Sequence, residues 1–128
     1  MTSTEHKESI LRVLEGRNLT DITFMGGANG YIIFNFDGPV LQAYTLPIVT
    51  IEKKKFTVAM AGYYDSLCKQ ITKLATKTSE DKERIVIEFV DKVQIEISLK
   101  DEDSVCAEAA MFNVNLGKKN WMVWRPGD

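Results

Sequence analysis

The sequence predicts an α+β fold, with a mainly antiparallel sheet and two helices packed on one side of it. Apolar residues fall on alternate positions twice in succession within residues 84–99, which is typical of a β-hairpin. Two shorter segments, near residues 10–14 and 62–71, favour helices instead. Because strands with one apolar face must bury that face against another layer, we expect the helices to cover the sheet.

The hairpin at residues 84–99 is the clearest element of the chain. The residues expected on its buried face are Ile85, Ile87, Phe89, Val93, Ile95, Ile97 and Leu99. A three-residue loop at residues 90–92 brings the two apolar faces together, whereas a two-residue turn would place Glu88 opposite Ile95. The loop contains no glycine, so Asp91 or Lys92 must adopt the left-handed conformation.

The other elements are expected in the following order. The first helix ends at Gly16, and strands follow near residues 19–24, 31–36, 40–46, 48–51 and 56–60. Turns rich in glycine and proline separate the first three strands, at residues 26–30 and 37–39. After the hairpin we expect one or two helical turns through residues 107–111 and a final strand at residues 121–124.

Two parts of the chain align with one another. Residues 8–14 match residues 65–71, and residues 32–46 match residues 85–99, so that Phe36 meets Phe89 and Val40 meets Val93. We therefore expect a single domain, residues 1–128, with two internal repeat units at residues 8–60 and 65–124. Each unit would be a helix followed by an antiparallel meander. Coincidence is the alternative, because the identities are few.

Composition excludes several classes of protein. The 128 residues are 45% hydrophobic and 27% charged, with a net charge of −2, which is ordinary for a globular domain. No apolar run approaches the roughly 20 residues of a membrane span, and residues 1–7 lack the apolar segment of a signal peptide, so we expect a cytoplasmic protein. No basic stripe with interleaved aromatic residues indicates a nucleic-acid partner.

The residues that usually carry catalysis are poorly placed. The single histidine, His6, lies in a polar N-terminal segment, and Cys68 falls among apolar neighbours that favour a place in the core. Cys68 and Cys106 have neither CxxC nor metal-ligand spacing, so we expect reduced thiols. The acidic run at residues 101–103 lacks the glycine and the final glutamate of a calcium-binding loop. We therefore expect no catalytic residue, no cofactor and no metal.

The strongest candidate for a binding surface is an acidic segment in the second half. Asp101, Glu102, Asp103 and Glu108 occur within eight residues that contain no lysine or arginine. Such a segment suits a basic partner, with Trp124 as a nearby anchor. Trp121 and Trp124 lie on opposite faces of the last strand, so one of them can stay partly exposed. The alternatives are that the carboxylates only keep a sheet edge soluble and that both tryptophans pack on the helices.

Short motifs in the same half match a known pattern. They are Phe89-Val90-Asp91, the strand at residues 93–99, Glu102-Asp103, Glu108-Ala109-Ala110 and Trp121-Met122-Val123-Trp124. This pattern resembles that of small bacterial proteins, some of them immunity proteins of contact-dependent and other polymorphic toxin systems. The glycine or proline usual before Glu-Ala-Ala is replaced here by Cys106-Ala107. The resemblance implies a non-enzymatic cytoplasmic protein that binds a cognate toxin domain.

Two functional hypotheses follow. The first is an immunity protein that occludes the active site of its toxin, for which a basic nuclease domain would suit the acidic segment. The second is a small-molecule-binding or weakly catalytic domain, with a pocket between sheet and helices. The tyrosines available to line that pocket are Tyr31, Tyr44, Tyr63 and Tyr64. Neither hypothesis predicts an oligomeric state.

Overall fold

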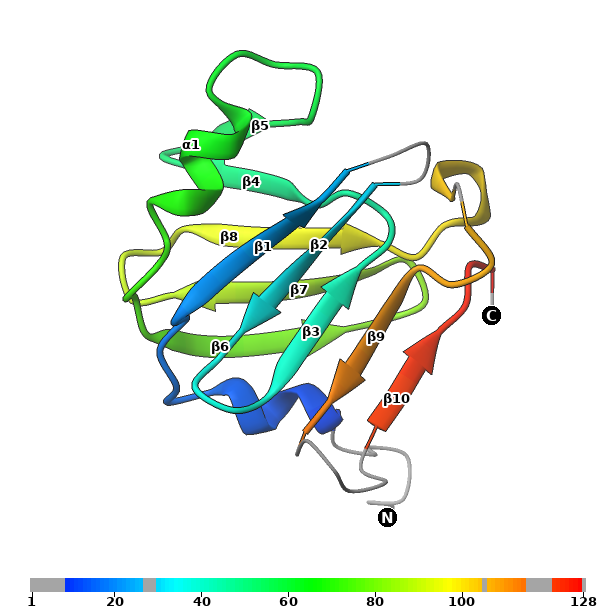
Figure 1. The fold of residues 1–128 in the computed structure, drawn as a ribbon, viewed down its shortest axis with the longest axis horizontal. Coiled ribbons are helices and arrows are strands. Elements are labelled where there is room, and N and C mark those ends of the chain that lie inside the picture. The colour runs from blue at the N-terminus through cyan, green and yellow to red at the C-terminus, as the bar shows by residue number, and fades with distance from the viewer. Residues whose placement is uncertain (1–8, 27–29, 105, 115–120, 128) are drawn as a thin grey trace.

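Two five-stranded antiparallel sheets make up the fold (Figure 1). The computed structural model describes residues 9–26, 30–104, 106–114 and 121–127. Sheet I has the order β1-β2-β3-β9-β10, formed by Asp21–Met25, Tyr31–Asn35, Val40–Ala43, Ala110–Asn113 and Trp121–Trp124. Sheet II has the order β5-β4-β8-β7-β6, formed by Lys54–Phe56, Ile48–Ile51, Gln94–Ser98, Arg84–Phe89 and Ala75–Glu80. The antiparallel sheet predicted from the sequence is confirmed.

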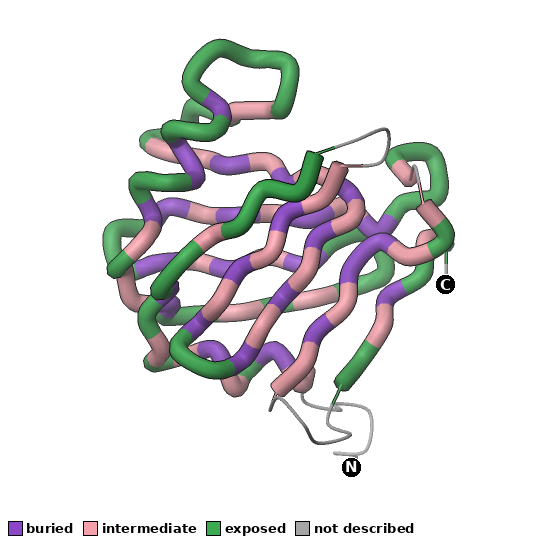
Figure 2. The backbone as a smooth tube through the Cα atoms, in the orientation of Figure 1, coloured by how far each residue is buried: buried purple, intermediate pink, exposed green. Residues whose placement is uncertain are grey.

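One core fills the space between the sheets. Along β2, β3, β7, β8 and β9 buried residues alternate with half-buried or exposed ones, so that each sheet turns one face inward (Figure 2). Phe34 from sheet I and Ile87 from sheet II belong to the same buried cluster. The rings of Phe36 and Phe89 stack with their centroids 6.4 Å apart, which joins the two sheets directly.

The central hairpin has the predicted register. Ile85 pairs with Ile97 and Ile87 with Ile95, and all four residues are buried. The N–H of Phe89 donates to the carbonyl of Val93 at 2.8 Å and closes the predicted three-residue loop. Within that loop Lys92 takes the left-handed conformation, with φ of 67°.

The layer that covers each sheet differs from the α+β prediction. It is the other sheet, because the helical segments are too short to cover one. Residues 10–14 form a 3₁₀ helix, η2 (Ile10–Leu14), which lies against β6, and the single α-helix of the described residues, α1 (Tyr63–Cys68), contacts β4. The helical turns expected at residues 107–111 give way to β9, whose Ala110 and Phe112 point into the core between β3 and β10. Tertiary pairing outweighs the helix propensity of alanine there.

The two halves of the chain use the same order of elements. In each, a short helix precedes a three-strand meander, β1-β2-β3 or β6-β7-β8, and a hairpin follows. Each hairpin joins the opposite sheet: β4 pairs with β8, and β9 pairs with β3. The predicted units at residues 8–60 and 65–124 would produce this arrangement, and the internal repeat itself stays a prediction. The loop after Phe36 is one residue shorter than the loop after Phe89, so Pro39 rather than Val40 occupies the place of Val93.

Candidate functional site

The acidic run lies directly after β8, in the 3₁₀ helix η3 (Asp101–Asp103), whose three side chains are exposed. The hydroxyl of Ser98 holds this turn, because it donates to Asp103 Oδ2 at 2.5 Å and accepts the N–H of Lys100 at 3.2 Å. The N–H of Gly127 donates to the carbonyl of Leu99 at 3.1 Å. The C-terminal end of the chain therefore lies beside η3.

The turn between β6 and β7 adds two more exposed carboxylates to this region. The N–H of Leu99 donates to the carbonyl of Glu83 at 2.8 Å, which fixes the turn next to η3. Within the turn, Asp81 Oδ1 accepts the N–H groups of Glu83 at 2.7 Å and Arg84 at 3.1 Å. We call the exposed carboxylates of this region the acidic end: Asp81, Glu83, Asp101, Glu102 and Asp103. In Figure 1 it lies at the same end of the molecule as the C-terminus.

Basic side chains border the acidic end without neutralising it. They are Lys82, Arg84, Lys100 and Arg125. Arg84 is engaged elsewhere, since its Nη1 lies 3.4 Å from Glu96 Oε2 on the outer face of sheet II. Carboxylates outnumber the remaining cations, so the surface potential here is negative and favours the approach of a cationic partner.

The structure places Glu108 apart from the other three predicted carboxylates. It is half-buried and lies two residues before β9 of sheet I, whereas η3 follows β8 of sheet II. Burial raises the pKa of Tyr44, and the charges of Tyr31 and Glu108 raise it further. Glu108 therefore belongs electrostatically to the pair Tyr31 and Tyr44, whose ring centroids lie 5.1 Å apart.

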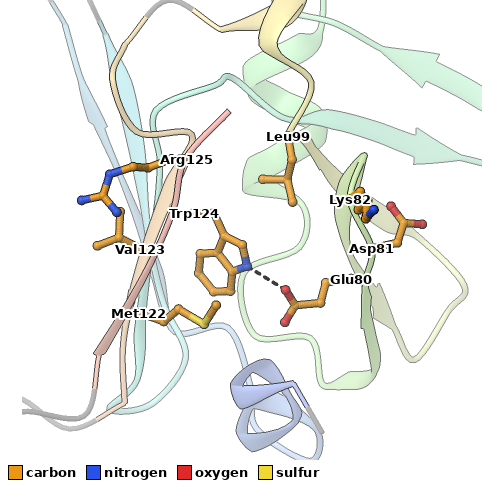
Figure 3. Close-up of a pocket in the computed structure, with 8 residues that line it drawn as sticks. All are labelled: Glu80, Asp81, Lys82, Leu99, Met122, Val123, Trp124 and Arg125. Carbon is orange, nitrogen blue, oxygen red and sulfur yellow. Dashed lines mark hydrogen bonds between the residues drawn. The ribbon is translucent and has the colours of Figure 1, made fainter. Parts of the chain in front are cut away.

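Trp124 is buried, and only 6% of it is exposed. Its indole N–H donates to Glu80 Oε2 at 2.7 Å (Figure 3). The other oxygen, Glu80 Oε1, accepts a hydrogen bond from the hydroxyl of Ser9 at the start of η2. One carboxylate thus ties the edge strand of sheet I and the helix η2 to the edge strand of sheet II. A partner could contact Trp124 only if the indole left this position.

A cavity of about 330 Å³ lies beside this hydrogen bond. In Figure 3 Trp124 and Met122 point toward Glu80, while Val123 and Arg125 point away from it. Both oxygens of Glu80 already accept hydrogen bonds from the protein. The carboxylate therefore holds two edges together, which is a structural role.

The exposed tryptophan of the last strand is Trp121, with 55% of its surface accessible. Trp121 and Val123 lie on the outer face of sheet I, because their strand neighbours Met122 and Trp124 pair with the buried Phe112 and Ala110. A row of uncharged residues crosses this face from strand to strand: Thr23, Ile33, Gln42, Met111 and Val123. The sequence predicted that one tryptophan can stay partly exposed and proposed Trp124 as the anchor, but Trp124 is the buried one.

The outer face of sheet II has the opposite character. Arg84 pairs with Glu96, and the side-chain amide of Gln94 donates to Glu88 Oε1 at 3.3 Å. Glu88 and Glu96 thus make surface contacts with neighbouring side chains of the same sheet. The contrast between the faces marks sheet I as the better surface for apolar contact with a partner.

Of the four tyrosines, the structure places Tyr31 and Tyr64 beside a hollow. Its lining is Phe24, Met25, Tyr31, Ile32, Leu46 and Tyr64, with Gly26 and Gly30 at the hairpin tip, and its volume is about 520 Å³. We call it the aromatic hollow. Tyr63 is buried instead, and its hydroxyl donates to the carbonyl of Pro47 at 2.6 Å.

The other candidate groups, possible metal ligands and cysteine thiols, do not form a site in the described part of the chain. Within the described ranges no three residues of the types His, Cys, Asp and Glu are placed to hold a metal ion, and His6 lies outside those ranges. Cys68 is exposed rather than in the core, because Tyr63, Ser66 and Leu67 form the buried side of α1. No described helix has the length and apolar character needed to cross a membrane.

Comparison with protein-family models, curated proteins and solved structures finds no match for this chain.

Proposed function

We propose that this chain is a non-enzymatic, cytoplasmic binding protein that neutralises a cognate toxin domain by covering its active site. The observation that carries the proposal is the acidic end, where two separate segments present five exposed carboxylates on one surface. A nuclease carries cationic side chains where it contacts the phosphate backbone, and an anionic surface is complementary to such side chains.

The placement of the carboxylates supports recognition of a partner. Asp81 and Asp103 are fixed by hydrogen bonds within their turns, so their negative charge is held in place before the partner arrives. Glu102 has an exposed side chain in the middle of η3. Fixed surface charge raises the rate of encounter with an oppositely charged partner more than it slows dissociation.

Slow dissociation needs apolar contact as well, and the outer face of β9 and β10 can supply it. Trp121 is the most exposed tryptophan, and Met111 and Val123 pair with each other across the two strands. Tryptophan is among the residues that most often dominate the energy of protein interfaces. Trp121 therefore replaces Trp124 as the proposed anchor.

Co-expression tests the proposal. The protein is produced together with the toxin domain encoded beside its own gene, and growth of the host is measured with and without it. We expect the protein to restore growth and to co-purify with the toxin domain in a stoichiometric complex. Growth arrest that the protein does not relieve, or the absence of a neighbouring toxin gene, would contradict the proposal.

Surface variants then test which part of the protein binds. Glu102→Lys combined with Asp103→Lys should weaken protection, and Trp121→Ala should shorten the lifetime of the complex. The control is Asp21→Lys combined with Asp65→Lys, which reverses two exposed carboxylates on β1 and α1 and should leave protection intact.

A further inference from the structure

The aromatic hollow lies where the tip of the β1–β2 hairpin approaches α1. Its floor reaches the core, because Ile32 is only 2% exposed. Its sides are more open: 39% of Phe24, 40% of Met25 and 51% of Tyr64 are accessible to solvent. The volume of about 520 Å³ falls within the range of pockets that bind small molecules.

Aromatic contacts hold the walls in place. The rings of Phe24 and Tyr64 meet edge to face, with centroids 5.2 Å apart, and this contact connects β1 to α1. Tyr64 also meets Tyr63 edge to face at 5.1 Å. Tyr63 is anchored by its hydrogen bond to Pro47, so α1 and the ring of Tyr64 have a fixed support. The hollow is therefore formed before any ligand arrives.

Among the described residues, none that lines the hollow is charged at neutral pH. A charged ligand would lose part of its hydration there without gaining a partner of opposite charge, which is unfavourable. A neutral aromatic ligand would bury its faces against Phe24, Met25 and Tyr64, and the exposed hydroxyl of Tyr64 can donate to it or accept from it.

The corresponding place in the other half of the fold is a more polar hollow. In the β1–β2 hairpin Phe24 pairs with Ile32, and in the β6–β7 hairpin Glu80 pairs with Ile85. Ile32 and Ile85 are the residues that the sequence alignment equates. At Glu80 the carboxylate accepts the hydrogen bond from Trp124 beside the cavity of about 330 Å³, whose lining is partly charged, whereas at Phe24 apolar side chains remain exposed. The two hollows therefore differ in polarity, and the apolar one is the aromatic hollow.

We propose that the aromatic hollow is a binding site for a neutral, aromatic small molecule. The site is separate from the acidic end, so it does not depend on the proposed toxin partner.

The test uses the neutral fluorescent probe N-phenyl-1-naphthylamine with the full chain. We expect saturable binding of one probe per protein, with chemical-shift changes at the methyl groups of Met25 and Ile32. Tyr64→Asp should weaken binding at least tenfold while the melting temperature stays close to that of the wild type. The control is Val90→Asp, because Val90 is 61% exposed at the β7–β8 turn and lies outside the hollow.

A second variant covers the case in which Tyr64→Asp does not fold. Met25→Lys places a charge at the rim, on a residue that is already 40% exposed. This variant should also weaken binding of the probe at least tenfold. Absence of saturable binding, or equal affinity in the wild type and in the folded rim variants, would overturn the proposal.

Discussion

Phe36, which follows β2, and Phe89, the last residue of β7, stack on one another between the two sheets, with their ring planes 16° apart. Each of them closes the hairpin at the centre of its own half of the chain, through a hydrogen bond from its N–H to Pro39 or to Val93. The predicted internal repeat aligns these two residues, and the structure brings them into contact. The contact therefore joins the two sheets at the point where both meanders turn.

Replacing the two phenylalanines by leucine, singly and together, should reveal the interaction energy between their rings. Both side chains are fully buried, so Phe36→Leu and Phe89→Leu should each reduce the free energy of unfolding by about 1–2 kcal/mol. Because aromatic pairs contribute about 0.5–1.5 kcal/mol beyond their buried area, the double variant should lose less than the sum of the single ones. Urea unfolding of all four proteins measures the coupling, and strictly additive losses would show that the rings do not interact.

The hydrogen bonds of Glu80 should stabilise the contact between β6 and β10, the edge strands of the two sheets. Glu80→Ala leaves the indole N–H of Trp124 without its acceptor, and we expect a loss of about 1–3 kcal/mol in the free energy of unfolding. Glu83→Ala is the matched control, because this neighbouring glutamate is exposed and should change stability by less than about 0.5 kcal/mol. Equal losses in both variants would argue against the role of Glu80.

The two faces of sheet II should respond differently to a change of charge. Ile87 is 1% exposed, so Ile87→Asp buries an unpaired carboxylate and should unfold the protein, since that penalty of several kcal/mol approaches the total stability. Glu96→Lys breaks only the surface pair with Arg84, worth about 1 kcal/mol or less. The melting temperature should therefore fall sharply for the first variant and hardly change for the second, and similar values would contradict the face assignment.

Stability should decrease in alkaline solution because of Tyr63. Burial raises the pKa of its hydroxyl above the ordinary value of 10.0, and Tyr64 raises it further. In the unfolded chain the tyrosine ionises at about pH 10, so above that pH the folded state binds more protons and its stability falls as the pH rises. Below about pH 10 this contribution is complete. The loss of stability between about pH 10 and about pH 11 should be smaller in Tyr63→Phe than in the wild type.

The central hairpin could be predicted from the sequence because the alternation of apolar and polar residues and the length of the loop agree on one register. Ile85, Ile87 and Ile95 can share a face only if the loop has three residues. The layer that packs on the apolar face of each sheet could not be predicted in the same way. An apolar face must be buried, but nothing in the face itself indicates whether a helix or a second sheet buries it. The strand β9 is short and begins with alanine, so its pairing with β3 came only from the tertiary structure.

The acidic end could be predicted only in part. Asp101, Glu102 and Asp103 are adjacent in the sequence, whereas Asp81 and Glu83 join them through a backbone hydrogen bond between distant segments. Alternation placed Trp121 and Trp124 on opposite faces of one strand. Which face turned inward depended on the pairing of β10 with β9, and that pairing buries Trp124.

The most direct test of the proposed function is the rate of association between the protein and its toxin domain, measured at several salt concentrations. For the wild type we expect fast association that slows steeply as salt increases, because exposed charges are screened beyond about 8–10 Å. Glu102→Lys with Asp103→Lys should slow association at low salt and flatten its salt dependence, while Asp21→Lys with Asp65→Lys should retain most of both. Unchanged rates in the first double variant would contradict the proposal, and the binding surface would then be sought at Lys53 in the β4–β5 turn and at Lys54 and Lys55 on β5.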